Sequence, residues 1–178
     1  MLLKGKKIVL GVTGGIAVYK AVDLVSRLRK QGAEVRVVMT EHARQFVTPL
    51  TFKEISGNAV ATSMWNSNQE FNVEHIALAN WADVFVVAPA TANIIAKMAH
   101  GLADDLLSTT LLAAQAPIIV CPAMNTGMYE NALTQENITC LKEHGVTMMP
   151  PAIGFLACGT SGAGRLPEPC EIVEFVKA

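Results

Sequence analysis

Charged side chains are scarce in this sequence of 178 residues. Asp, Glu, Lys and Arg make up 16% of it, against roughly a quarter in an average soluble domain. The formal net charge is −1, and the Lys and Arg residues are scattered without forming a basic stripe. Such a charge distribution gives no electrostatic support for nucleic-acid binding, so we expect no nucleic-acid partner.

With 51% hydrophobic residues and few charged ones, the sequence has few polar side chains to cover the surface of a monomer. Either other copies of the chain cover part of the apolar surface, or a sheet is buried on both faces, and the two explanations are compatible. The length fits one domain with a substantial core, which we expect to span residues 1–178.

Cysteine pairs with C-x-x-C spacing are absent, and no His–Cys cluster has the spacing of a zinc site. We therefore expect no metal site and reduced thiols in a cytoplasmic protein. The four cysteines are Cys121, Cys140, Cys158 and Cys170.

Long apolar runs are absent too, since none reaches the ~18 residues of a membrane span. The lysine-flanked stretch IVLGVTGGIAVY superficially resembles a secretory signal. Gly14 and Gly15 interrupt it, however, and Lys20 and Asp23 follow at once. A strand, a turn and a helix explain this segment better, and we expect no membrane association.

Short apolar runs rich in β-branched residues alternate with helical patterns along the chain, which predicts an α/β fold with a doubly wound parallel sheet, flavodoxin-like or Rossmann-like. The expected strands are Lys6–Val12, Glu34–Thr40, Asp83–Ala90, Pro117–Ala123 and Val146–Met149. The first expected helix places Ile16, Tyr19 and Leu28 on one face and ends near Gly32, and a second starts at Thr48-Pro49. The other expected helices are Thr91–Gly101, Asp104–Ala114, Ala132–His144 and Glu168–Lys177.

Ligands of such sheets bind beyond the carboxyl ends of the strands. The turn after the first strand, Thr13–Ile16, has glycines that let a phosphate approach a helix start. The dinucleotide pattern G-x-G-x-x-G is missing, and Met39-Thr40 stands where a ribose-binding acid would be, so NAD is disfavoured. A purely structural turn and a mononucleotide site both remain open for this motif.

Two further turns carry polar groups, PATAN (Pro89–Asn93) and PAMN (Pro122–Asn125). Thr91 is an ordinary helix N-cap residue that is also placed to meet a ligand. The Asn125 amide could cap the next helix or hold a substrate carboxylate. His75 is either structural or, if it borders the pocket, suited to proton transfer near neutral pH.

Together, GVTGGIAVYK, PATAN, P-x-M-N-x-x-M (Pro122–Met128) and ACG-x-x-G-x-GR (Ala157–Arg165) resemble the flavin-containing cysteine decarboxylases over nearly the whole chain. The phosphopantothenoylcysteine decarboxylases are the most similar branch. The resemblance implies a flavodoxin-like fold, bound FMN, and decarboxylation of 4'-phosphopantothenoylcysteine to 4'-phosphopantetheine in coenzyme A biosynthesis, a carbon–carbon lyase reaction without net redox change.

The resemblance also implies roles for individual residues. His75 assists decarboxylation, Asn125 holds the substrate carboxylate, and Cys158 protonates the enethiolate. The stretch GFLACGTSGAGRL (Gly154–Leu166) is a supple loop that closes over the substrate. The implied flavin contacts are Gly14, Gly15, Ile16, Thr40, Thr91, Asn93 and Ser108, and the implied substrate contacts are Asn125, Met128, Ala157, Cys158, Gly159 and Arg165.

Members of this family form homotrimers, often assembled into dodecamers, with active sites between subunits. In the bacterial bifunctional protein the decarboxylase is fused to a synthetase half, so both a stand-alone and a fused protein stay open here. Three other functions stay open. A peptidyl-cysteine decarboxylase would use the same chemistry. A flavin prenyltransferase would need a prenyl phosphate site and not Cys158. A catalytically inactive regulatory subunit would usually have a long acidic tail, which this sequence lacks.

Overall fold

A five-stranded parallel sheet forms the centre of the molecule. A computed structural model describes residues 2–65, 74–155, 159 and 161–178. The strands lie in the order β2-β1-β3-β4-β5, which is the flavodoxin-like order. Each expected strand is present and is one residue shorter at one end or both: β1 Lys7–Val12, β2 Glu34–Met39, β3 Val84–Ala90, β4 Ile118–Pro122 and β5 Thr147–Met148. The predicted flavodoxin-like fold is confirmed.

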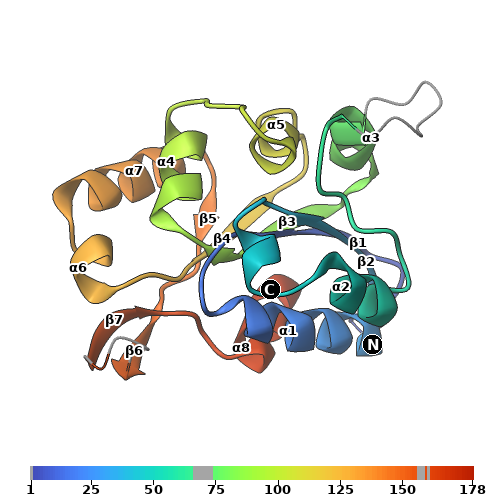
Figure 1. The fold of residues 1–178 in the computed structure, drawn as a ribbon, viewed down its shortest axis with the longest axis horizontal. Coiled ribbons are helices and arrows are strands. Elements are labelled where there is room, and N and C mark those ends of the chain that lie inside the picture. The colour runs from blue at the N-terminus through green and yellow to red at the C-terminus, as the bar shows by residue number, and fades with distance from the viewer. Residues whose placement is uncertain (1, 66–73, 156–158, 160) are drawn as a thin grey trace.

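Helices cover both faces of the sheet (Figure 1). Side chains of β1 alternate between two cores: Ile8 and Leu10 pack with one helix layer, and Val9 with the other. One layer holds α1 (Val18–Lys30), α2 (Pro49–Ser56) and α8 (Pro169–Lys177), and the other holds α3 (Glu74–Trp81), α4 (Ala92–Ala99), α5 (Leu106–Leu112) and α7 (Ala132–Glu143). Burial on both faces therefore explains part of the low charge content.

Three elements differ from what the sequence pattern predicts. The α3 helix and the short turns η1 (Ala43–Gln45) and α6 (Thr126–Tyr129) were not anticipated. The helix α1 buries Leu28 as expected, but Ile16 lies before the helix begins, and Ile16 and Tyr19 are 60% and 62% exposed. Both of these side chains face a pocket rather than the core.

The stretch predicted to be a supple loop is largely an antiparallel hairpin. β6 (Ala152–Phe155) pairs with β7 (Ser161–Arg165), while 156–158 and 160 lie outside the described residues. The Met124 amide donates to the Gly164 carbonyl at 2.9 Å. Gly164 has φ of 129°, and a Cβ there would collide with the Met124 carbonyl oxygen. Glycine therefore allows the hairpin to dock against the turn that follows β4.

Helices of the described residues are all too short or too polar to cross a bilayer.

Candidate functional site

The site lies where β1 and β3 end side by side and the chain turns to opposite faces of the sheet. Thr13, directly after β1, links the two ends. Its hydroxyl donates to the Pro89 carbonyl at 2.7 Å and accepts from the Thr91 amide at 3.0 Å. The Ala88–Pro89 peptide bond is cis. This is the topological switch point at which doubly wound folds bind ligands.

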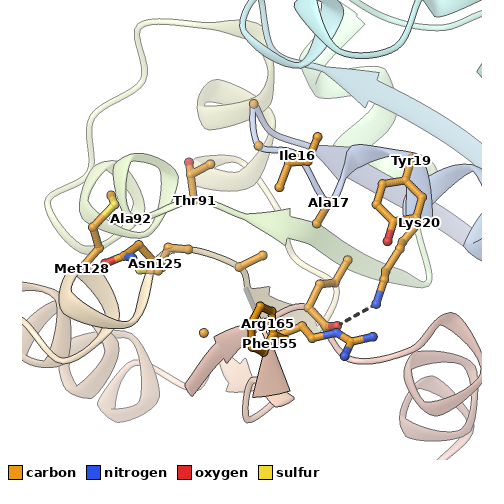
Figure 2. A pocket seen from close by; sticks show the side chains of 16 residues that line it. Ile16, Ala17, Tyr19, Lys20, Thr91, Ala92, Asn125, Met128, Phe155 and Arg165 are labelled. Atoms are coloured by element: carbon orange, nitrogen blue, oxygen red, sulfur yellow. Dashed lines mark hydrogen bonds between the residues drawn. The ribbon is translucent and has the colours of Figure 1, made fainter. Parts of the chain in front are cut away.

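A pocket of about 740 Å³ opens at this point. The turns after β1, β3 and β4 all contribute to it, together with the first turn of α1 and the β6–β7 hairpin. Figure 2 shows Asn125 and Met128 beside Thr91 and Ala92 at one end, and Tyr19 and Lys20 at the other. The volume falls within the range of small-molecule and cofactor sites.

Seven of the predicted site residues line this pocket: Gly14, Gly15, Ile16, Thr91, Asn125, Met128 and Arg165. They come from four separate segments, so the fold brings the three candidate turns and the hairpin together. Their roles stay predictions, since proximity alone does not assign chemistry.

The other predicted site residues that the structure describes do not line the pocket. Thr40 follows β2, and its hydroxyl accepts from the Ala43 amide at 3.3 Å. Asn93 is exposed in the first turn of α4. Gly159 is described, is exposed and has φ of 85°. Ala157 and Cys158 lie outside the described residues.

His75 also lies away from the pocket. It is in the first turn of α3, and Figure 1 shows α3 and the hairpin at opposite ends of the molecule. A single chain therefore does not bring the His75 imidazole together with the Asn125 amide.

Ser108 has a structural role in this chain. It is 3% exposed and belongs to the capping box of α5. Its amide donates to Asp105 Oδ1 at 2.8 Å, and its hydroxyl accepts from the Asp105 amide at 3.2 Å. Burial by itself would raise the pKa of the Asp105 carboxyl, but hydrogen bonds from Ser108 and from Lys97 outweigh burial and hold that pKa below its ordinary value.

We expect Asp105→Ala to lower the free energy of unfolding by about 1–2 kcal/mol at neutral pH, because it removes this cap. A carboxyl whose folded pKa is lowered stabilises the protein above its ordinary pKa of about 3.9, and this contribution is lost as the pH falls through the folded value. Urea unfolding between pH 7 and pH 2.5 should show the two proteins converging in acid. Asp104→Ala is the control, since Asp104 also pairs with Lys97, at 2.6 Å, but its side chain is 68% exposed. An equal loss in both variants would contradict the capping role.

The turn after β1 forms a cradle of backbone donors. Among the described residues, the N–H groups of Gly14, Gly15, Ile16 and Ala17 donate to no protein acceptor. The turn leads into the positive end of α1. A Cβ on Gly15 would have Thr91 Cγ2, at 4.0 Å, as its nearest neighbour, and Gly15 lines the pocket. Free amides at a helix start and room for close approach suit a phosphate group.

The Asn125 amide performs the capping role considered from the sequence. Its Oδ1 accepts from the Gly127 amide at 2.8 Å, which caps α6. The residue also lines the pocket. Capping and ligand contact are therefore compatible, because the capping bond fixes the orientation of the side chain at the pocket rim.

Positive charge gathers at the opposite end of the pocket. Lys20 Nζ lies 2.8 Å from Glu168 Oε1, and Arg165 Nη2 lies 2.6 Å from the same oxygen. Hydrogen bonding to Lys20 is the main cause that holds the pKa of Glu168 below its ordinary value. Glu168 is therefore ionised at neutral pH beside two cations.

The site residues predicted from the sequence did not include Thr13, Tyr19, Lys20 and Phe155, although Thr13 belongs to the candidate turn. The sequence does contain an indication of Lys20, because Lys20 stands four residues before Leu24 and so lies on the same, buried face of α1. A lysine on the inner face of an amphipathic helix indicates a paired or functional charge. Thr13, a hydroxyl directly after a buried strand, carries a weaker signal of the same kind.

Neither a metal centre nor the Cys121 thiol adds to the described site. No group of three or more His, Cys, Asp or Glu residues within the described ranges is arranged to hold a metal ion. Cys121 is fully buried in β4, and burial raises its pKa to about 12. Its thiol stays protonated and is not a nucleophile.

Comparison with known proteins assigns the family. The sequence model of a family described as Flavoprotein matches residues 2–178. The chain belongs to the flavoprotein family. Within that family, the chain is similar to the coenzyme A biosynthesis bifunctional protein CoaBC of Haemophilus influenzae, at 52% identity over 97% of this chain. It spans 43% of the length of that relative.

Solved structures of similar proteins share the fold. A cysteine-to-serine mutant of PPC decarboxylase, complexed with pantothenoylaminoethenethiol, is 34% identical with a TM-score of 0.87, over 98% of this chain and 97% of that one. The FMN-dependent cysteine decarboxylase SpaF is 31% identical with a TM-score of 0.82, over 99% of both chains.

Proposed function

We propose that this chain is an FMN-dependent decarboxylase that converts 4'-phosphopantothenoylcysteine (PPC) to 4'-phosphopantetheine in coenzyme A biosynthesis, with residues 1–178 as the decarboxylase domain. The observation that carries the proposal is the pocket at the switch point, which places a phosphate cradle and the Asn125 amide in one cavity. Similarity to CoaBC and to PPC decarboxylase supports this substrate.

FMN fits the residues that are present. The free amides of Gly14, Gly15, Ile16 and Ala17 are donors for its phosphate. Thr91 lies beside Gly15. When bound, FMN supplies a reversible two-electron oxidation of the cysteine moiety, which makes loss of its carboxylate possible.

The chain's own side chains orient the substrate and move its proton. The Asn125 amide binds the departing carboxylate at the pocket rim, held in place by its bond to Gly127. Met128 packs beside it. Cys158, by resemblance, protonates the enethiolate after carbon dioxide has left. Phe155 and Arg165 of the hairpin line the same pocket.

The His75 side chain reaches this chemistry only if a second copy of the chain supplies it. The proposed assembly is a homotrimer or a dodecamer with the pocket at a subunit boundary. Exposed apolar side chains support such an assembly, among them Ile76 next to His75 at 43% and Leu112 on α5 at 62% exposure. A fused synthetase half, as the CoaBC relatives suggest by their length, and a cytoplasmic location complete the proposal.

Product analysis tests the reaction. FMN-loaded protein is incubated with PPC, with a peptide ending in cysteine, and with FMN plus a prenyl phosphate, and the products are identified by mass spectrometry. We expect phosphopantetheine from PPC and no comparable turnover of the other two. Rapid decarboxylation of the peptide alone would favour a peptidyl-cysteine decarboxylase, and a prenylated flavin would favour a flavin prenyltransferase.

Cys158→Ser should change the product rather than abolish carbon dioxide release. Serine is a far weaker acid than cysteine, so protonation of the enethiolate stalls after decarboxylation. We expect carbon dioxide and an oxidised enethiol product in place of phosphopantetheine. Cys170→Ser, at an exposed position in α8, is the control. A normal yield of phosphopantetheine from Cys158→Ser would refute the proposed acid.

A further inference from the structure

The charged side chains among the described residues that line the pocket are Lys20 and Arg165, and both lie at the hairpin end. The Lys20 side chain is only 8% exposed. Its Nζ donates to the Leu166 carbonyl at 3.3 Å and to Glu168 Oε1 at 2.8 Å. A buried ammonium is costly without a counter-charge, so its place inside the pocket wall is a specific arrangement.

Both cations converge on one oxygen of one carboxylate. Arg165 Nη2 donates to Glu168 Oε1 at 2.6 Å, the same atom that Lys20 contacts. An oxygen bound by an ammonium and a guanidinium has the surroundings that proteins give to phosphate oxygens. The Glu168 side chain is 47% exposed, so a competing anion can reach the two cations from solvent. Its carboxylate occupies the position that a bound anion would take.

This cation pair is separate from the backbone cradle. The free amides of Gly14–Ala17 lie before the start of α1, whereas the Lys20 ammonium is directed to the β7–α8 connection through Leu166 and Glu168. The pocket therefore has two places suited to phosphate. Asn125 lies at the end away from Lys20 (Figure 2), which suits an elongated ligand with a carboxylate at one end and a phosphate at the other.

We propose that Lys20 and Arg165 bind the phosphomonoester of the substrate and that Glu168 is a displaceable stand-in for it, so that these three residues set the preference for a phosphorylated substrate. This inference rests on the proposed function. The phosphate dianion replaces the Glu168 carboxylate on the two cations, and the carboxylate moves to solvent.

The test measures binding and turnover separately. Dissociation constants of FMN-loaded protein for phosphopantetheine and for pantetheine are measured by calorimetry, and kcat and KM are measured for PPC and for its dephosphorylated form. The variants are Lys20→Met, Arg165→Gln and Glu168→Gln. Arg27→Gln is the control, because Arg27 pairs with Asp23 at 2.7 Å on the same helix but lies outside the pocket. FMN affinity is measured in parallel by flavin fluorescence.

Lys20→Met and Arg165→Gln should each lower the preference for the phosphorylated ligand by about 10- to 100-fold, the effect of one charge-assisted hydrogen bond, mostly through Kd and KM. Glu168→Gln should instead raise the preference for the phosphorylated ligand and tighten phosphopantetheine binding several-fold. Arg27→Gln should change neither quantity.

Equal loss for both ligands in the Lys20 and Arg165 variants would overturn the inference. A selective loss of FMN affinity would instead assign these cations to the cofactor phosphate. Absence of decarboxylation by the wild-type protein, with phosphate-dependent binding retained, would refute the proposed reaction but not this subsite.

Discussion

Replacement of Gly15 by valine should yield a folded protein that no longer holds FMN. A Cβ on Gly15 meets only Thr91 Cγ2, at 4.0 Å, and it points into the pocket. The branched side chain would fill the space that a phosphate needs beside the amides of this turn. We expect FMN affinity to fall on the order of 100-fold, as overpacking of a closely fitted site costs 1–3 kcal/mol. Flavin absorbance after purification and titration with FMN measure the effect.

Gly14→Ala is the informative contrast. A Cβ there would overlap the Cβ of His42 and come within 2.9 Å of its carbonyl carbon. This substitution should destabilise the fold itself by about 1–3 kcal/mol. Because bound ligand raises apparent stability, melting temperatures are compared without flavin. Gly15→Val should then match wild type, and Ala59→Val, at an exposed position, serves as the control. Full FMN affinity in Gly15→Val would contradict the placement of the cradle.

Asn125→Asp should leave the structure intact and reduce kcat/KM for PPC by about 100- to 1,000-fold. The new carboxylate keeps the oxygen that accepts from the Gly127 amide and caps α6. It replaces an amide donor by a negative charge, however, which repels the carboxylate of the substrate. Loss of one preorganised donor at a reacting anion has effects of this size. Steady-state kinetics and urea unfolding give the two readouts.

Asn131→Asp is a matched control. Asn131 caps α7 in the same manner, with its Oδ1 accepting from the Leu133 amide at 3.0 Å. It is exposed and does not line the pocket. Comparable stability of the two variants, with activity lost only in Asn125→Asp, is the expected result. If Asn125→Asp remains active, the amide does not bind the substrate carboxylate.

The sheet and its ligand edge were predictable because buried parallel strands leave an unambiguous pattern. Val86, Val87 and Ala88 of β3, for example, are all fully buried. Once the strand order is fixed, the turns at Thr13, Thr91 and Asn125 must meet at one edge. The convergence of these motifs thus follows from topology, although the assignment of FMN depends on the family.

The hairpin and α3 were less accessible to sequence reasoning. β7 contains Gly162 and Gly164, residues of low strand propensity, and it depends on a distant hydrogen bond to Met124. α3 is short and buries Leu78 and Ala79 while exposing Ile76, so it has no clear apolar stripe. The capping box of Asp105 and Ser108 is a local feature of α5, and the predicted flavin contact of Ser108 stays a prediction.

The predicted role of His75 cannot be derived from the structure of one chain. The α3 helix packs against α5, and no contact among the described residues directs His75 to the pocket. A motif that works across a subunit boundary leaves no trace in intrachain geometry. The proposed assembly therefore needs its own measurement of mass in solution, and His75 variants are informative only beside that measurement.

Release of labelled carbon dioxide from carboxyl-labelled PPC is the most direct measurement of the central claim, that a flavin in this pocket decarboxylates the substrate. The protein is assayed with FMN bound, after removal of FMN, and after FMN is added back. We predict release in proportion to bound FMN, no release from the flavin-free protein, and recovery on reconstitution. Release without flavin, or none from fully loaded and folded protein, would contradict the account.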